Sequence, residues 1–343
     1  MTILILIAVI LGIMVLVKLM NIVQLSTQVS GYEETEDDQI KENNYAGIGL
    51  MLFMIIGLSL TVLMIVSYRP HLLPVAASEH GVGLDKLLNI NWIVIGFVFF
   101  ITQITLFYFA HKYRHTKGKV AYFYPMNHKL EIVWTAIPTI VLSILIVTGL
   151  QEWHKILMTE KKDAVNVQVY GYQFAWITRY SGKDNTLGKS NYKLITDENP
   201  LGLETSDPAM KDDVYTTGNE MHIPVGQEIK FQFNARDVIH SAYFPHFRAQ
   251  MNLVPGMNTF FTFKPTITTE EMRNITKNDK FDYVLLCNKV CGVAHYTMKM
   301  TVVVDTPEDF KKWLRKQKKA REISSTPTVA ENTTVNKEVT ATL

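Results

Sequence analysis

The stretch that decides how this chain is interpreted is CNKVCGVAHYTM, residues 287–298. It holds Cys287, Cys291, His295 and Met298, so two thiols, an imidazole and a thioether lie close together in the sequence. Thiolate and thioether sulfurs are soft ligands that suit copper, and imidazole suits it also. The chain has only these 2 cysteines and no C-x-x-C-H motif, so a disulfide framework and attached c-type haem are both excluded.

A second histidine, His240, precedes this stretch by 47 residues when counted back from Cys287. Each residue also has an ordinary alternative: the cysteines can form a disulfide in an oxidising compartment, Met298 can belong to a core, and His240 can be a hydrogen-bonded surface residue. A structural zinc site would not be expected to use methionine, and a blue copper site takes one cysteine. Together these side chains are too many for one copper ion, and they suit two copper ions that share both sulfurs as bridges.

The sequence around this stretch predicts an all-β outer half. Runs rich in β-branched and aromatic residues, separated by Gly, Pro, Asn and Asp clusters, are typical of a β-sandwich or barrel. These runs are Val165–Tyr172, Glu228–Asn234, Thr259–Lys264, Tyr283–Leu286 and Lys299–Asp305. Asn185–Glu220 is polar and aperiodic, which indicates an inserted loop. Pro307–Lys319 predicts a basic amphipathic helix, and Ser324–Leu343 predicts a disordered tail.

The long apolar runs lie in the first half of the chain, although the 343 residues as a whole are 48% hydrophobic and 19% charged. A membrane-spanning helix needs about 20 mostly apolar residues. Three runs meet this without a charge: Tyr45–Ser67, Ile90–Ala110 and Ile132–Leu150. A fourth, Ile3–Val23, contains only Lys18 and predicts a retained helix, with a cleaved signal peptide as the alternative. A purely soluble enzyme is therefore excluded, and the net charge of +2 gives no argument for nucleic-acid binding.

Charges in the loops predict the orientation in the membrane. His111–Leu130 carries several lysine and arginine residues and no acidic residue, so the positive-inside rule places it in the cytoplasm. Everything after Leu150 then lies outside, as does Arg69–Asn89, and Gln24–Asn44 lies inside. That inner loop is acidic, which weakens the placement of the first helix without reversing it.

The C-x3-C-x3-H-x2-M pattern resembles the binuclear copper A site of cytochrome c oxidase subunit II. LEIVWTAIP at 130–138 is similar to the start of the family's second membrane helix, and GYQFAW at 171–176 is similar to its aromatic strand. His240-Ser241 and Val254-Pro255-Gly256 also match. The resemblance implies a membrane-anchored all-β fold, in which N-terminal transmembrane helices precede a cupredoxin-like β-sandwich. We expect two additional helices with loops at 1–89, a transmembrane hairpin at 90–150, the copper A domain at 151–310, and a basic helix end with a disordered tail at 311–343.

The resemblance also implies a metal site and an activity. The implied copper ligands are His240, Cys287, the backbone carbonyl of Lys289, Cys291, His295 and Met298. Cys287 and Cys291 would bridge the two copper ions. The chain would then be a subunit of an oxidoreductase complex that passes electrons from cytochrome c to haem in subunit I, reduces O₂ to water and pumps protons. Subunit I, the other oxidase subunits and membrane lipid are the expected partners, in a bacterial inner membrane with the copper domain on the periplasmic side.

The chain departs from the family pattern at three positions. Lys289 replaces a glutamate whose side chain helps bind Mg²⁺ at the contact with subunit I, which puts that site in doubt. Phe174 replaces the tryptophan at which electrons arrive, with Trp176 nearby as a second aromatic residue on the implied route. Arg179 stands where an acidic residue helps to dock basic cytochrome c, although Asp237 is retained. We therefore expect a donor that is membrane-tethered or complex-bound rather than a strongly basic soluble cytochrome c.

Several alternatives stay open. Glu131, at the cytoplasmic start of the last membrane helix, is either an interfacial acid or, as the resemblance implies, the start of a proton path into subunit I. The chain could also be a copper-free quinol-oxidase relative, a tethered copper-binding or delivery protein, or an assembly protein with a Cys287–Cys291 disulfide. The intact ligand set argues against the first, and the matches at 130–138 and 171–176 argue against the second. The sequence names neither the electron donor, nor the haem types, nor the role of the two extra helices.

Overall fold

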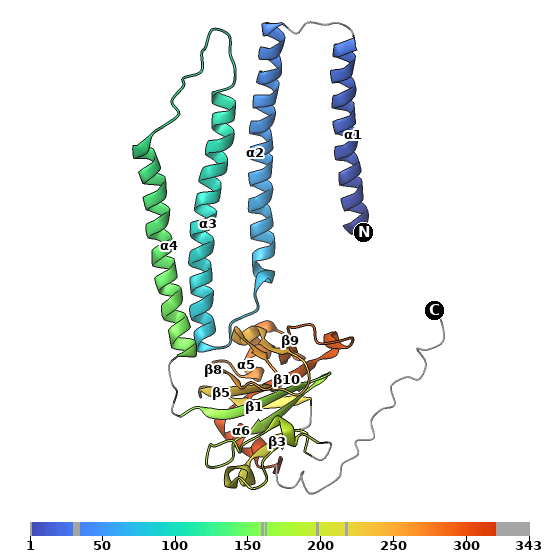
Figure 1. The fold of residues 1–343 in the computed structure, drawn as a ribbon, viewed down its shortest axis with the longest axis vertical. Helices are drawn as coiled ribbons and strands as arrows, with labels where there is room; N and C mark the ends of the chain where they lie inside the picture. The colour runs from blue at the N-terminus through green and yellow to red at the C-terminus, as the bar shows by residue number, and fades with distance from the viewer. Residues whose placement is uncertain are drawn as a thin grey trace, which may run out of the picture. The chain divides into compact units, whose positions relative to one another are not determined.

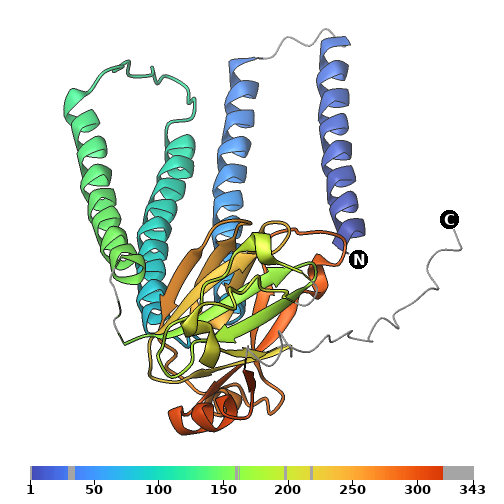
Figure 2. The same ribbon diagram turned by 60° about the horizontal axis from the view of Figure 1, so that its bottom comes forward.

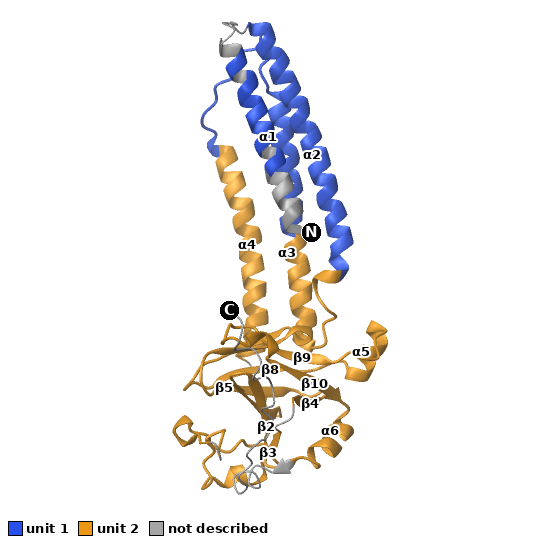
Figure 3. Ribbon diagram, turned by 90° about the vertical axis from the view of Figure 1, so that its right-hand side faces the viewer, with its two compact units in different colours: residues 1–70, 94–128 blue, residues 71–93, 129–343 orange. Residues whose placement is uncertain are grey.

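The structure is a computed structural model that describes residues 2–29, 35–158, 161, 163–196, 199–216 and 219–319. In these residues, four long helices precede a β-rich domain (Figure 1). The chain divides into two compact units, which Figure 3 shows in two colours. One unit comprises residues 1–70 and 94–128, and the other comprises residues 71–93 and 129–343.

The long helices are α1 (Thr2–Val29), α2 (Glu36–Leu72), α3 (Glu79–Lys112) and α4 (His128–Leu157). Three of them, α2, α3 and α4, are long and apolar enough to cross a membrane, which confirms three of the predicted spans. Their apolar stretches are not buried inside the protein, as expected for surfaces that lipid covers. Among the described side chains of α1, the apolar stretch is Met14–Val23, which is shorter than a span needs, so the fourth span stays a prediction.

The first unit brings the acidic and basic loops to the same end of its helices. Lys117 Nζ lies 2.8 Å from Asp37 Oδ1. Arg114 Nε donates to Asn44 Oδ1 at 2.7 Å and so joins the segment after α3 to α2. Both segments therefore lie at the same end of this unit, which the prediction that both are cytoplasmic requires.

The β-rich domain is a sandwich of two sheets, seen from another side in Figure 2. Among the described residues, the six-stranded sheet has the order β11 (Lys318–Lys319), β3 (Val214–Thr216), β2 (Ala175–Tyr180), β1 (Val165–Tyr172), β5 (Ile229–Ala235) and β8 (Thr259–Phe263). The five-stranded sheet has the order β4 (Glu220–Pro224), β10 (Lys299–Asp305), β9 (Tyr283–Cys287), β6 (His240–Phe244) and β7 (Ala249–Leu253). The predicted membrane-anchored β-sandwich is thereby confirmed.

The strands form because apolar side chains alternate with polar ones. In β10, Met300, Val302 and Val304 are buried while the residues between them are partly exposed, which is the period of a strand with one face in the core. The two inner faces meet in an aromatic core where, for example, the ring centroids of Phe231 in β5 and Phe244 in β6 lie 5.4 Å apart. This core supports the ends of the strands from which the ligand residues extend.

The predicted inserted loop, Asn185–Glu220, packs onto the outer face of the six-stranded sheet. It contains two short 3-10 helices, η1 (Tyr192–Leu194) and η2 (Pro208–Asp212), and the strand β3. It shares a small core with the outer face of β1 and β2, formed by Tyr170, Ile177, Leu201, Leu203, Met210 and Tyr215. The described residues of the insertion therefore form a layer that covers part of the sheet.

That layer corrects the interpretation of Arg179. Its side chain is 1% exposed, and its Nη1 lies 2.9 Å from Asp213 Oδ2 in an ion pair. Nη2 donates to the carbonyl of Gly188 at 2.9 Å. Arg179 is thus a structural residue beneath the insertion, and the expectation that it weakens an exposed docking face is wrong.

Two short helices complete the sandwich. The first, α5 (Thr269–Thr276), begins with a capping box between Thr268 and Glu271 and was not predicted. The second, α6 (Pro307–Leu314), confirms the start of the predicted basic helix but ends earlier than expected, before β11. The predicted disordered tail, Ser324–Leu343, lies outside the described residues.

Candidate metal centre

The residues predicted to bind metal gather at one end of the five-stranded sheet. β6 begins at His240 and β9 ends at Cys287, and these neighbouring strands pair with Ala242 opposite Cys287. The loop after β9 returns through a short 3-10 helix, η4 (His295–Thr297), to β10. Two strand ends and one loop therefore bring together residues that are far apart in the sequence.

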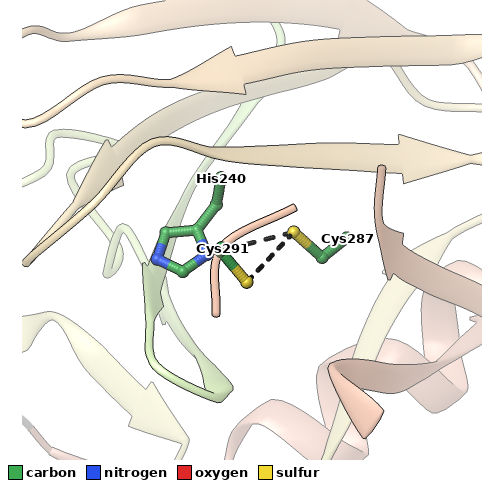
Figure 4. Close-up of side chains that lie close together, drawn as sticks. All are labelled: His240, Cys287 and Cys291. Atoms are coloured by element: carbon green, nitrogen blue, oxygen red, sulfur yellow. Dashed lines mark hydrogen bonds between the residues drawn. The ribbon is translucent and has the colours of Figure 1, made fainter. Parts of the chain in front are cut away.

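The two cysteines and His240 form a compact group (Figure 4). Cys287 Sγ lies 3.9 Å from Cys291 Sγ and 3.9 Å from His240 Nδ1. A disulfide requires sulfurs about 2.05 Å apart, so the cysteines are free. A metal–thiolate bond is about 2.3 Å long, so one metal can bind both sulfurs if they lie within about 4.6 Å of each other. The pair meets this condition and fits a metal bound by both sulfurs.

The remaining predicted ligands adjoin the same two sulfurs. The carbonyl oxygen of Lys289 lies 3.2 Å from Cys287 Sγ. His295 Nδ1 lies 3.5 Å from Cys291 Sγ, and Met298 Sδ lies 3.9 Å from it. The structure thus brings together every predicted ligand, with a nitrogen donor beside each cysteine. This set of sulfur and imidazole donors is one that copper prefers.

A carboxylate orients His240 toward the sulfurs. Asp237 Oδ1 lies 2.8 Å from His240 Nε2, while His240 Nδ1 faces Cys287. Asp237 also accepts hydrogen bonds from the backbone N–H groups of Gln173 at 2.8 Å and Val238 at 2.7 Å. Such a carboxylate holds the imidazole so that its other nitrogen can bind a metal. The sequence predicted Asp237 only as part of a docking face. Its contact with His240 is a role that the sequence analysis did not identify.

The two thiols differ in their pKa. Burial raises the pKa of Cys287, but hydrogen bonds with His240 and with the backbone of Ser241 and Lys289 outweigh burial and lower it. Burial, together with the neighbouring charge of Cys287, raises the pKa of Cys291. The structure therefore favours a thiolate at Cys287, which is the form that binds metals. Binding by both sulfurs requires release of the proton on Cys291.

Aromatic residues in the β1–β2 turn and at the start of β2 lie against the candidate ligands and their loop. Trp176 is 3% exposed, and its ring centroid lies 6.2 Å from that of His240. Phe174 is half-buried, and a Cβ added at Gly292 would lie 2.8 Å from its ring atoms. Gln173 Nε2 donates to the carbonyl of Cys291 at 2.5 Å. The turn therefore packs against the loop through Gln173 and Phe174. Of the two aromatic rings, that of Phe174 is partly exposed and that of Trp176 is buried.

Three apolar side chains are exposed on the loop from Cys287 to Met298, which we call the ligand loop. Val290, Val293 and Tyr296 are 82%, 93% and 86% exposed, although they alternate with ligands. Side chains exposed to this degree contribute nothing to the core. They form what we call the apolar collar, defined by these three residues.

Comparisons with known proteins agree with this geometry. The family described as "Cytochrome C oxidase subunit II, transmembrane domain" matches residues 66–151, and the family described as "Cytochrome C oxidase subunit II, periplasmic domain" matches residues 165–306. The chain belongs to the cytochrome c oxidase subunit II family. It is therefore a subunit of a haem–copper oxidase, an oxidoreductase complex, and is membrane-bound with a periplasmic domain.

Curated relatives of this chain also carry the name of cytochrome c oxidase subunit 2. The "Alternative cytochrome c oxidase subunit 2" of Bradyrhizobium diazoefficiens is 36% identical over 236 residues, which cover 68% of this chain and 80% of the relative. The cytochrome c oxidase subunit 2 of Thermostichus vulcanus is 26% identical over 273 residues, which cover 73% and 80%. The periplasmic domain of subunit II of cytochrome oxidase from Bradyrhizobium japonicum aligns with a TM-score of 0.31 at 18% identity, covering 48% of this chain and 99% of that structure.

Proposed function

We propose that this subunit II holds two copper ions between Cys287 and Cys291 and uses them to accept electrons from cytochrome c. The observation that supports this most is the pair of free sulfurs 3.9 Å apart, flanked by His240 on one side and His295 on the other. A bound copper pair would supply one-electron chemistry, with electrons passing on to haem in subunit I for the proton-pumping reduction of O₂. The intact donor set argues against a copper-free quinol-oxidase subunit.

The chain's own residues hold the ligands in place. Cys287 N–H donates to the carbonyl of Met298 at 3.1 Å, and Asn288 N–H donates to the carbonyl of Ser241 at 2.9 Å. The second bond attaches the loop to β6, and the first joins the two ends of the loop. Ligands held this way move little when the charge of the centre changes, and a small rearrangement favours fast electron transfer.

Metal content and electron paramagnetic resonance of the purified full chain test this proposal. We expect two copper ions per chain and an unpaired electron that is shared by two equivalent nuclei, which gives more hyperfine lines than a single nucleus does. Cys291→Ser should abolish that pattern, whereas Lys289→Ala should preserve it, because only the backbone of Lys289 faces the site. One copper ion per chain, or a single-nucleus pattern, would refute the proposal and favour a copper-delivery protein.

We further propose that the donor is not a strongly basic cytochrome c and binds through the apolar collar. The collar offers exposed apolar surface beside the ligands, and the nearby Lys289 and Lys299 are exposed. Asp237, the retained acid, already binds His240 and two backbone N–H groups. A donor of this kind loses little affinity as salt rises, since apolar contacts are not screened. Turnover with a basic cytochrome c that falls steeply with ionic strength would contradict this.

Glu131 lies in the first turn of α4 and is half-buried. We propose that it begins a proton path into subunit I. Glu131→Ala should then slow turnover of the assembled oxidase while its copper content stays normal. Glu152→Ala, near the opposite end of the same helix, is the matched control and should leave turnover unchanged. Normal turnover of the Glu131 variant would show that Glu131 is only an interfacial acid.

We place the chain in a bacterial inner membrane, with the sandwich on the periplasmic side and subunit I and the other oxidase subunits as neighbours. The several apolar helices and the loop charges support this. Lys289 carries an ammonium group, which cannot bind a cation, so we propose that a Mg²⁺ at the contact with subunit I does not use this side chain.

A further inference from the structure

The connection between α2 and α3 is bound tightly to the sandwich. We call residues 74–85 the docking segment; it lies in the same compact unit as the sandwich. Its Ala77 N–H donates to the carbonyl of His246 at 2.7 Å, and its Glu79 N–H donates to the carbonyl of Lys264 at 3.0 Å. His246 belongs to the 3-10 helix η3 (Pro245–Phe247), which follows β6, whereas Lys264 follows β8. The docking segment therefore contacts both sheets of the sandwich.

A charged pair strengthens this attachment. Arg248 Nε and Nη2 each lie 2.9 Å from one carboxylate oxygen of Asp85, which is a bidentate arrangement. Arg248 also donates to the carbonyls of Pro245 at 2.7 Å and Pro74 at 2.6 Å. Its side chain is only 10% exposed. Bidentate arginine–carboxylate pairs fix geometry as well as supply energy, so this contact sets an orientation.

The packing around the pair leaves little freedom. Ala77 and Ser78 are fully buried, and Ser78 Oγ donates to the carbonyl of Phe247 at 2.7 Å. A Cβ added at Gly81 would lie 2.6 Å from Ser78 Oγ and 3.1 Å from Arg248 Cγ. The first turn of α3 thus fits against Arg248 without a gap.

Arg248 is joined directly to the strands that carry the metal ligands. It lies between η3 and β7, at the opposite end of the β6–β7 hairpin from His240. β6 in turn pairs with β9, with Ala242 opposite Cys287. A strand of five residues spans only about 17 Å. A shift at Arg248 therefore reaches His240 and Cys287 through one short, hydrogen-bonded hairpin.

We infer that Arg248 and Asp85 are positioning residues, which hold the ligand-bearing hairpin at a fixed orientation to the start of α3 and so fix the electron-transfer distance from the metal centre to its acceptor. The inference rests on the proposed function, because it concerns electrons that leave that centre. Electron tunnelling falls steeply with distance, so a small tilt of the hairpin slows the transfer. Such a tilt moves His240 and Cys287 together, because β6 and β9 are hydrogen-bonded neighbours, so the ligand set itself stays intact.

The test compares Asp85→Asn and Arg248→Met in the assembled oxidase with the wild type. Asp85→Glu, which keeps a carboxylate, is the conservative variant. Asp282→Asn, which breaks the exposed Arg273–Asp282 pair (2.8 Å), is the matched control. Three quantities are measured: copper content with its paramagnetic spectrum, the rate at which the donor reduces the centre, and the rate at which a photo-injected electron moves from the centre to haem.

We expect Asp85→Asn and Arg248→Met to slow only the last rate, by about tenfold, since misplacing reacting groups by about 1 Å costs up to about a hundredfold. Asp85→Glu should recover part of the loss, and Asp282→Asn should match the wild type. In the copper-free chain, Asp85→Asn should also speed amide exchange at Ala77 and Glu79. An unchanged rate to haem, or a loss of copper in proportion to the loss of rate, would overturn the inference. A wild-type spectrum without a copper pair would instead refute the proposed function.

Discussion

Gly292 of the ligand loop lies directly against the ring of Phe174. A Cβ at position 292 would lie 2.8 Å from ring atoms Cε1 and Cζ and 2.8 Å from Gln173 Nε2. The φ angle of Gly292 is +143°, a conformation that side chains other than glycine rarely adopt. The turn that carries Phe174 and the loop that carries the ligands therefore fit together only because residue 292 has no side chain.

Gly292→Ala should lower both copper occupancy and thermal stability. The added methyl group must push the loop off the β1–β2 turn, and the backbone strain alone costs about 1–3 kcal/mol. Copper per chain and the unfolding temperature measure the effect. Gly226→Ala is the control, because Gly226 also has a positive φ of +75° but has no atom within 4 Å of an added Cβ. Equal copper contents in the two variants would show that the contact with Phe174 is unimportant.

Asp237→Asn should weaken copper binding by about tenfold to a hundredfold, which is typical when a partner of a ligating histidine is lost. One carboxylate oxygen of Asp237 contacts His240 Nε2, and the other accepts from Gln173 N–H. An asparagine side chain has only one acceptor oxygen, so it cannot serve both partners as an acceptor. Competition with a copper chelator measures the affinity. Asp309→Asn, at an exposed site on α6 where the carboxylate contacts Lys312 and Thr306, should have no effect. Unaltered affinity in Asp237→Asn would mean that the loop alone orients His240.

The ligand loop could be predicted because its pattern is local. Cys287, Cys291, His295 and Met298 are close in sequence, and their chemistry suggests a metal without knowledge of the fold. Val165–Tyr172 and Lys299–Asp305 were also predicted at their observed bounds, since each is a continuous run of strand-forming residues. Such features depend on residue type and spacing alone.

Features that depend on tertiary contact could not be predicted. The support of Cys291 by Gln173 joins residues 118 positions apart, and neither residue type signals it. Arg179 was assigned to a docking face only because the family pattern has an acidic residue there, whereas the insertion covers its side chain. Strands as short as β3, with three residues, carry too few side chains to show a period.

Removing Asp213 should destabilise the sandwich strongly. Burial raises the pKa of Asp213 to about 6 despite the charge of Arg179. Asp213→Ala leaves the buried guanidinium of Arg179 without its counter-charge, which typically costs about 3–5 kcal/mol. Chemical denaturation of the purified chain measures this. The double variant Arg179→Met with Asp213→Leu should recover much of the loss, because it leaves no buried charge. A double variant as unstable as the single one would show that the pair itself stabilises the fold.

His222 should make the stability of the sandwich depend on pH. Its Nδ1 lies 2.5 Å from Asp305 Oδ2 and its Nε2 lies 2.6 Å from Glu220 Oε1. The ring stacks on Trp313 of α6 with centroids 4.1 Å apart. Burial alone would lower the pKa of His222, but the hydrogen bonds with Asp305 and Glu220 outweigh burial and raise it.

Because the folded protein holds this proton more tightly than the unfolded chain, the stabilisation by His222 is complete below the unfolded pKa of about 6.5 and is lost as pH rises through the higher folded value. The unfolding temperature should therefore fall as pH increases above about 6.5. His222→Gln should be less stable than the wild type at low pH, and its unfolding temperature should fall less as pH increases above about 6.5. Trp313→Phe, which keeps both carboxylates, should retain the wild-type dependence on pH. Identical slopes for the wild type and His222→Gln would show that His222 does not bind its proton more tightly in the folded state.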